Sequence, residues 1–328
     1  MRNRQVSKSV LEYVYGLLGQ ITAGLPLLMI TSLIALNDSL ENAGKFTILV
    51  GLSSTIYSIA MWGFRPLIVL NKYTYNSNLF LFSRLLMLFI SGIGLFLFSY
   101  YMNYFWGFTL IIILIKSSDA IIDLNFGFLQ LKGAYIALKN YAILHLLKFV
   151  LIGAIFILAQ YSVINDANGF VIIAGTILFI VYVIKLIKEE DIKLSSDGLE
   201  LTNLKLIFLN STVFVIATGV CAFLTNAPRF FLEFFSNGEE LGVIGISLSV
   251  STLFGMTFNT NWQRYFSNFR NCKNLSRFSF RFIIENIAIS IFLSIMSVIL
   301  LPIMVSWGFG LDLEKYNTLM IYIFLSYI

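Results

Sequence analysis

Long apolar runs follow one another along the chain, separated by short polar segments. A helix needs about 20 apolar residues to cross the hydrocarbon core of a membrane, and on that criterion the sequence contains ten candidate spans. They cover residues 13–36, 46–64, 79–100, 106–124, 141–160, 170–187, 204–224, 241–258, 282–305 and 316–328. The pattern therefore predicts an all-α polytopic membrane protein.

The composition agrees with this prediction and excludes a soluble domain. Hydrophobic residues make up 58% of the 328 residues and charged residues only 12%, whereas a soluble domain is about half apolar and about a quarter charged. The one histidine and two cysteines form no cluster with metal-ligand spacing. We therefore expect neither a metal site nor a cofactor.

The basic residues are distributed very unequally between the segments predicted on the two sides of the membrane. If the N-terminus is cytoplasmic, 17 of the 22 Lys and Arg fall in cytoplasmic segments, Arg84 among them, and three fall on the other side. Only Lys116 and Lys148 are left inside spans. The positive-inside rule then predicts a cytoplasmic N-terminus. The basic residues of 262–281 are explained by contact with anionic lipid, so no nucleic-acid partner is implied.

A polar segment divides the predicted spans into two groups. We expect an N-terminal six-helix lobe at 1–188, a cytoplasmic linker at 189–203 and a C-terminal lobe of about four spans at 204–328. An offset of 198 residues across the linker pairs Glu41 with Glu239 and Gly44 with Gly242, which suggests a duplicated bundle. An equal second lobe would run to roughly residue 390, so the pattern predicts that the second bundle is truncated.

Three charges in or at the end of an apolar span mark residues 116–130. On a helix, Lys116, Asp119 and Asp123 are spaced i, i+3, i+7 and share one face. An ionised group near the bilayer centre costs about 2.5–3.5 kcal/mol on insertion scales. That face must therefore look into protein or into a wet cavity, which suggests a path for a polar substrate.

Three stretches resemble the bacterial oligosaccharide and polysaccharide flippases of the multidrug/oligosaccharidyl-lipid/polysaccharide exporter superfamily. Residues 116–130 are similar to the fourth-span signature, with the pattern Lys116…Asp123-x-x-x-Gly127-x-x-Gln130. Residues 226–242 resemble a second motif, in the order Asn226-Ala-Pro228-Arg229-Phe-Phe-Leu-Glu233 followed by Gly238-Glu-Glu-Leu-Gly242, with Phe230 where the family usually has Tyr. The third stretch is the beginning: a Gly-rich first span, a loop ending in Gly44, and Gly63-Phe-Arg65.

The resemblance implies two helical bundles around a central cavity. It also implies a transporter, not an enzyme, that flips an undecaprenyl pyrophosphate-type lipid-linked oligosaccharide from the cytoplasmic to the outer leaflet. The implied setting is surface polysaccharide synthesis, of O-antigen or capsule, in the bacterial cytoplasmic (inner) membrane. Besides its lipid-linked substrate and the membrane lipids, the polysaccharide polymerase and chain-length machinery are candidate partners.

Three basic residues are candidates for contact with an anionic substrate: Lys116, Lys148 and Arg229. Each also has a structural alternative. Lys116 can pair with Asp119, three residues away on the same face. Lys148 can extend to the membrane interface. Arg229 can pair with Glu233 at i, i+4.

Other residues are candidates for ion coupling or pairing. Asp119 and Asp123 can carry a coupling proton, although Asp123 lies near the predicted cytoplasmic end, where a solvated helix terminus is the alternative. His145, one turn from Lys148, either extends a cationic wall or packs as a core histidine. The family-motif positions are Gly127, Gln130, Pro228 and Gly242, of which the first two can also serve only to shape a helix end.

Two other functions remain open at this stage. A membrane-embedded polymerase or sugar transferase of the same pathway would normally have a large extramembrane loop with clustered Asp, Arg or His, and the sequence contains no such loop. A multidrug antiporter would share the fold of the superfamily. The stretches that carry the resemblance favour the flippase over both.

Overall fold

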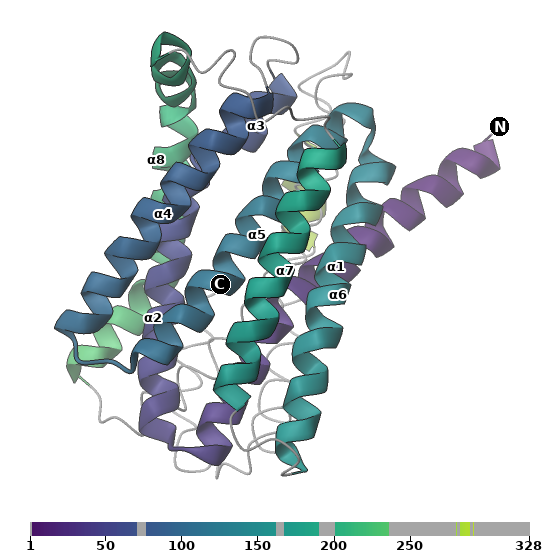
Figure 1. The fold of residues 1–328 in the computed structure, drawn as a ribbon. Helices are drawn as coiled ribbons and strands as arrows, with labels where there is room; N and C mark the ends of the chain where they lie inside the picture. The colour runs from purple at the N-terminus through teal and green to yellow at the C-terminus, as the bar shows by residue number, and fades with distance from the viewer. Residues whose placement is uncertain are drawn as a thin grey trace. The chain divides into compact units, whose positions relative to one another are not determined.

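The described part of the chain consists of helices. The computed structural model describes residues 2–70, 77–161, 167–189 and 201–235, with a few further positions between 280 and 291, and none of these residues is in a strand. The helices, drawn in Figure 1, are α1 (Arg2–Asn37), α2 (Leu40–Ala60), α3 (Phe64–Leu70), α4 (Ser77–Tyr101), α5 (Trp106–Lys132), α6 (Ala134–Gln160), α7 (Ala167–Glu189) and α8 (Leu201–Phe235).

Six helical segments of the described chain are long and apolar enough to cross a membrane. They are Val10–Leu36, Leu40–Val69, Ser77–Tyr101, Ala134–Gln160, Ala167–Glu189 and Thr202–Ala227. Each one overlaps a span predicted from the sequence, which confirms an all-α polytopic membrane protein. The predicted spans 241–258 and 316–328, and most of 282–305, lie outside the described residues. Which side each helix end faces stays a prediction.

The helix α5 differs from these six because it carries three charges in its middle. It has 27 residues, about 40 Å at a rise of 1.5 Å per residue, and most of its residues are buried. It packs against α7, α3 and α4. The charged helix is thus covered along most of its length by other helices.

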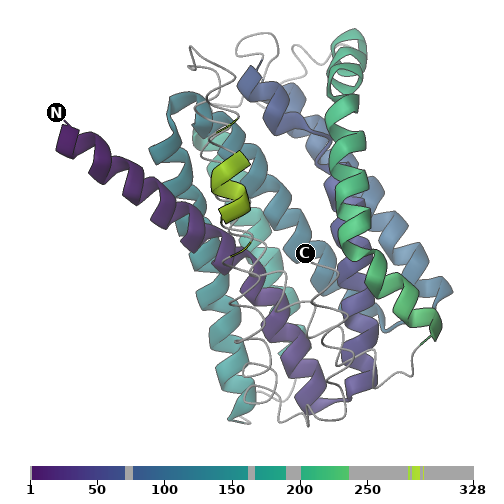
Figure 2. The same ribbon diagram turned by 180° about the vertical axis from the view of Figure 1, so that it is seen from behind.

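The chain forms two compact units, each assembled from separate segments. The first contains residues 1–47, 138–156 and 232–328, and the second contains 48–137 and 157–231. Within the second unit α8 runs along α2, where a Cβ at Gly219 would lie 3.0 Å from Ile59 Cγ1 (Figure 2). The division into lobes at 1–188 and 204–328 stays a prediction, as does a cavity between them.

A sharp break separates α2 from α3 inside the predicted span 46–64. Trp62 and Gly63 both have positive φ, 48° and 57°, and this conformation is uncommon for a bulky residue such as tryptophan. Trp62 is held there because its Nε1 donates a hydrogen bond to the Phe208 carbonyl oxygen at 3.2 Å. Gly63 leaves room for Phe214, which a Cβ would overlap. The break redirects the chain so that α3 lies against α5.

The connection between α4 and α5 is a tight turn beside a group of exposed aromatic residues. Asn103 has φ 53°, the Tyr104 N–H donates to Ser99 O and the Asn103 N–H donates to Tyr100 O. These two bonds form a Schellman motif, which ends a helix and satisfies its last carbonyls. The exposed residues are Tyr100, Tyr101, Phe105 and Trp106. Such a cluster is typical of a membrane–water interface.

Candidate functional site

Side chains from three helices of the second unit meet around one carboxylate on α5. Arg65 on α3 and Arg84 on α4 each place a guanidinium nitrogen 3.4 Å from an oxygen of Asp123. The Nε of Arg65 also donates a hydrogen bond to Gln130 Oε1 at 2.9 Å. We call these four residues the Asp123 cluster. Because two arginines share one carboxylate, the four side chains of the cluster together carry a net positive charge.

The arginines of the Asp123 cluster are enclosed by aromatic rings. The Arg65 guanidinium carbon lies 4.2 Å from the centroid of the Phe126 ring, and that of Arg84 lies 5.2 Å from Phe64. Arg84 is fully buried, at 0% exposed. Its Nε and Nη1 have no hydrogen-bond partner among the described residues. A buried donor left unsatisfied costs about 1–3 kcal/mol, so this guanidinium holds unused capacity for an acceptor.

Two expectations from the sequence are wrong at this cluster. Arg84 was counted in a cytoplasmic segment, but it lies inside α4 and is fully buried. The basic residues within spans are therefore not only Lys116 and Lys148. Asp123 was placed near a solvated helix end, but α5 continues to Lys132 and the Asp123 side chain is only 21% exposed. The burial of Arg84 could have been predicted, because it is a lone arginine inside the predicted span 79–100.

Gly127 allows the close approach on which the cluster depends. A Cβ at Gly127 would lie 3.4 Å from the Cα of Arg65, so α3 and α5 are in contact at this point. Gly63, Arg65, Gly127 and Gln130 all belong to stretches that carry the family resemblance. Two stretches that are far apart in the sequence thus meet in one place in the fold. Gln130 binds an arginine there, so its role extends beyond shaping a helix end.

Lys116 lies further along α5 and contacts α2. Its Nζ donates a hydrogen bond to Ser54 Oγ at 2.9 Å, and the neighbouring Ser117 Oγ lies 3.3 Å from the hydroxyl of Tyr57. Both Lys116 and Asp119 are half-buried. The lysine therefore has a hydroxyl partner on another helix. Its pairing with Asp119, proposed from the spacing, stays a prediction.

The first unit contains a separate buried polar group between α1 and α6. Lys148 is 0% exposed, and its Nζ lies 3.4 Å from the carbonyl oxygen of Ala23 as a donor. The ring of His145, 2% exposed, packs edge-on against Tyr141 with centroids 4.4 Å apart. The hydroxyl of Tyr141 accepts a hydrogen bond from Gln20 at 3.2 Å. A snorkelling lysine would have an exposed ammonium group, so that alternative for Lys148 is wrong.

Arg229 is buried in α8, at 5% exposed. Its Nη1 donates a hydrogen bond to Asn226 Oδ1 at 2.7 Å, and its Cδ lies 3.0 Å from where a Cβ of Gly51 would be. Two residues of the second resembling stretch therefore bind each other. The side chains of Pro228 and Glu233, and all of Gly242, lie outside what the structure describes, so the Arg229–Glu233 pair stays a prediction.

Comparison with known proteins gives no match to a family model, to a curated protein or to a solved structure. Among the described residues, no group of three or more His, Cys, Asp or Glu could hold a metal ion. The chemistry of this part of the chain is that of buried cations with carboxylate, hydroxyl, amide and carbonyl partners. Such groups bind anions and polar uncharged ligands.

Proposed function

We propose that this chain is a transporter that flips a lipid-linked oligosaccharide with an anionic diphosphate head group across a membrane. The observation that carries the proposal is the burial of cations within membrane-spanning helices. Lys148 and Arg84, each within a candidate span, are 0% exposed, and Arg229, two residues beyond the span Thr202–Ala227, is 5% exposed. Ionisable residues inside membrane spans are rare because they are costly, and they commonly mark the path of a substrate or an ion.

The sign of the buried charge favours an anionic substrate. In the Asp123 cluster two guanidinium groups share one carboxylate, and two nitrogens of Arg84 have no acceptor among the described residues. Phosphate oxygens match the planar donor array of arginine. A diphosphate and a chain of sugars cannot cross hydrocarbon unaided, because each buried charge and each unpaired hydroxyl is costly.

The resemblance supplies the rest of the proposal. It supports a lipid carrier of the undecaprenyl type, a surface glycan as the product, and alternating exposure of a site between two bundles. In this mechanism Lys116 and Lys148 hold the anionic head group, and Arg229 lies near the exit. The lipid tail stays in the bilayer during transfer, and Asp119 is the candidate for ion coupling.

The test removes the two lysines singly and together and measures glycan export in the host. After deletion of the gene, we expect surface glycan to be lost and its lipid-linked precursor to accumulate. Lys116→Gln and Lys148→Gln should restore export poorly at normal protein levels. Lys205→Gln, at an exposed position of α8, is the matched control and should restore it fully. Normal export by the double variant would refute the role of these lysines.

The deletion itself separates the alternatives. Loss of a polymerase leaves single repeat units on the surface, since export still takes place. Loss of a multidrug antiporter changes drug susceptibility and leaves the glycan intact. Either result would overturn the flippase proposal.

A further inference from the structure

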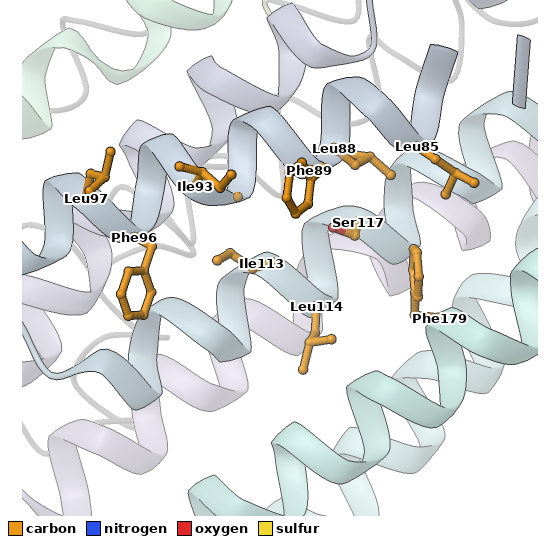
Figure 3. A pocket seen from close by; sticks show the side chains of 11 residues that line it. Leu85, Leu88, Phe89, Ile93, Phe96, Leu97, Ile113, Leu114, Ser117 and Phe179 are labelled. Atoms are coloured by element: carbon orange, nitrogen blue, oxygen red, sulfur yellow. The ribbon is translucent and has the colours of Figure 1, made fainter. Parts of the chain in front are cut away.

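An apolar groove runs along the outside of α4, α5 and α7 in the second unit. Its volume is about 520 Å³. Leu85 to Leu97 of α4 form one wall, Ile113 and Leu114 of α5 form the floor, and Phe179 of α7 closes the other side (Figure 3). Ser117 contributes the one hydroxyl among the lining side chains. The groove therefore suits a hydrocarbon.

The groove lies on a face of α4 that other described helices leave exposed. Two of its lining residues, Phe89 and Leu97, are 66% and 61% exposed, so no other described residue covers them. Because α4 is a membrane span, these side chains face the hydrocarbon of the bilayer. Leu85 and Leu97 are about 18 Å apart along the helix at 1.5 Å per residue. One leaflet contributes about 15 Å of the hydrocarbon core, which matches a single lipid chain.

A second, more polar pocket adjoins the Leu97 end of the groove. It has a volume of about 240 Å³, and Phe96 lines both cavities. Its other lining residues are Ser99, Tyr100, Asn103, Tyr104 and Trp106. They offer hydroxyl, amide and indole groups beside aromatic faces, at the turn where exposed aromatic residues cluster. Among the described residues, no charged side chain lines either cavity, so the pocket suits a head group without net charge.

We propose that the groove and this pocket together form a binding site for one membrane phospholipid. One acyl chain lies along α4 from Leu97 to Leu85, and an uncharged or zwitterionic head group, such as phosphoethanolamine, lies in the pocket beside Asn103 and Trp106. The aromatic side chains bind at the interface through their amphipathic rings. This site does not depend on the transport of a lipid-linked sugar.

Two glycines of α4 provide a matched pair of variants. A Cβ at Gly92, which lines the groove, would lie 3.7 Å from Ile113 Cγ2. That distance is an ordinary contact, so a side chain is accommodated there but occupies the groove. A Cβ at Gly94 would have no atom within 4 Å. Gly92→Leu should therefore displace the lipid chain, while Gly94→Leu adds the same side chain outside the groove.

The experiment uses the full chain in nanodiscs of phosphatidylethanolamine and phosphatidylglycerol. A trace of phosphatidylethanolamine with a photoreactive group on its acyl chain is cross-linked by light, and the modified peptides are mapped by mass spectrometry. We expect adducts to concentrate at residues 85–97 and 113–117, to decrease in Gly92→Ala and to be lost in Gly92→Leu. Gly94→Leu should retain them. If Gly92→Leu fails to fold, the smaller substitution Gly92→Ala still tests whether a side chain in the groove reduces labelling.

Four outcomes would contradict the proposal, the last of them only its head group. Adducts spread evenly over every lipid-facing helix would indicate ordinary annular lipid. Equal labelling of Gly92→Leu and Gly94→Leu would place the lipid outside the groove. Absence of lipid adducts at residues 85–97 in a protein that runs as a dimer in size-exclusion chromatography would indicate that a second copy covers this face. A phosphatidylglycerol probe should label less than the phosphatidylethanolamine probe, and the reverse order would refute the assigned head group.

Discussion

Two neighbouring helices, α5 and α7, differ in where they carry charge and in what surrounds them. α5 carries Lys116, Asp119 and Asp123 in its middle and is buried along most of its length. α7 has no charged residue before Lys185, and its outer face is exposed, with Ile173 58% and Ile177 53% accessible. The two pack against each other. The difference shows that charge is placed where protein, not lipid, provides the surroundings.

The largest effect is expected from removing the carboxylate that compensates the arginines of α3 and α4. Asp123→Asn leaves the fully buried Arg84 without its ion pair, and breaking a buried pair from one side costs about 3–5 kcal/mol. We expect a large fall in the midpoint of thermal unfolding of the purified protein. Glu41→Gln is the control, because the pair of Glu41 with Lys45 is exposed and such surface pairs contribute little to stability. If the two variants lowered the unfolding midpoint equally, the ion pair of Asp123 with Arg84 would contribute no more to stability than an exposed pair.

A charge moved to the outer face of α7 should have the next largest effect. Ile177→Asp places a carboxylate in the middle of a helix face that the described residues leave exposed, and insertion of aspartate at the helix centre costs about 2.5–3.5 kcal/mol. We expect less of the chain to be inserted, measured as the membrane-protected fraction after protease treatment. Ile177→Leu should behave as the unchanged protein. Normal insertion of Ile177→Asp would show that this face of α7 meets water or protein.

The smallest effect is expected where the two helices are joined. Asn125 Nδ2 of α5 donates a hydrogen bond to Glu189 Oε2 of α7 at 2.9 Å, and loss of such a bond to a partly exposed carboxylate costs about 1–2 kcal/mol. Asn125→Ala should speed hydrogen exchange near the end of α7. Thr176→Val removes an exposed hydroxyl whose hydrogen bond, to the Ile172 carbonyl oxygen, lies within α7, and it should change stability by less than about 0.5 kcal/mol. Similar exchange in both variants would contradict a stabilising link.

The sequence was sufficient for the fold where long apolar runs decide it. α4 and α7 coincide with predicted spans within a few residues, because lipid contact requires continuous hydrophobicity. The end of α5 was placed too early, since the charges at 116–123 reduce its hydropathy. The charge of Asp123 is compensated within the fold by Arg65 and Arg84, which approach from other helices. Local sequence does not contain that information.

The candidate site was predictable only in part for the same reason. Lys116, Asp123 and Gln130 are conspicuous because they interrupt an apolar helix. The charge count puts Arg84 in a cytoplasmic segment, although it lies inside the predicted span 79–100. The break at Trp62 and Gly63 could not be foreseen, because the positive φ of Trp62 depends on its contact with Phe208, 146 residues later.

The pairing of Arg84 with Asp123 also has a consequence for how the protein is made. During synthesis Arg84 emerges 39 residues before the carboxylate that neutralises it, and neither α4 nor α5 is free of charge on its own. The tight turn at Asn103 joins the two helices closely enough for them to enter together. We therefore expect α4 to remain at the translocation channel until α5 has been synthesised. The two helices should then enter the bilayer together as one hairpin, with the ion pair already formed.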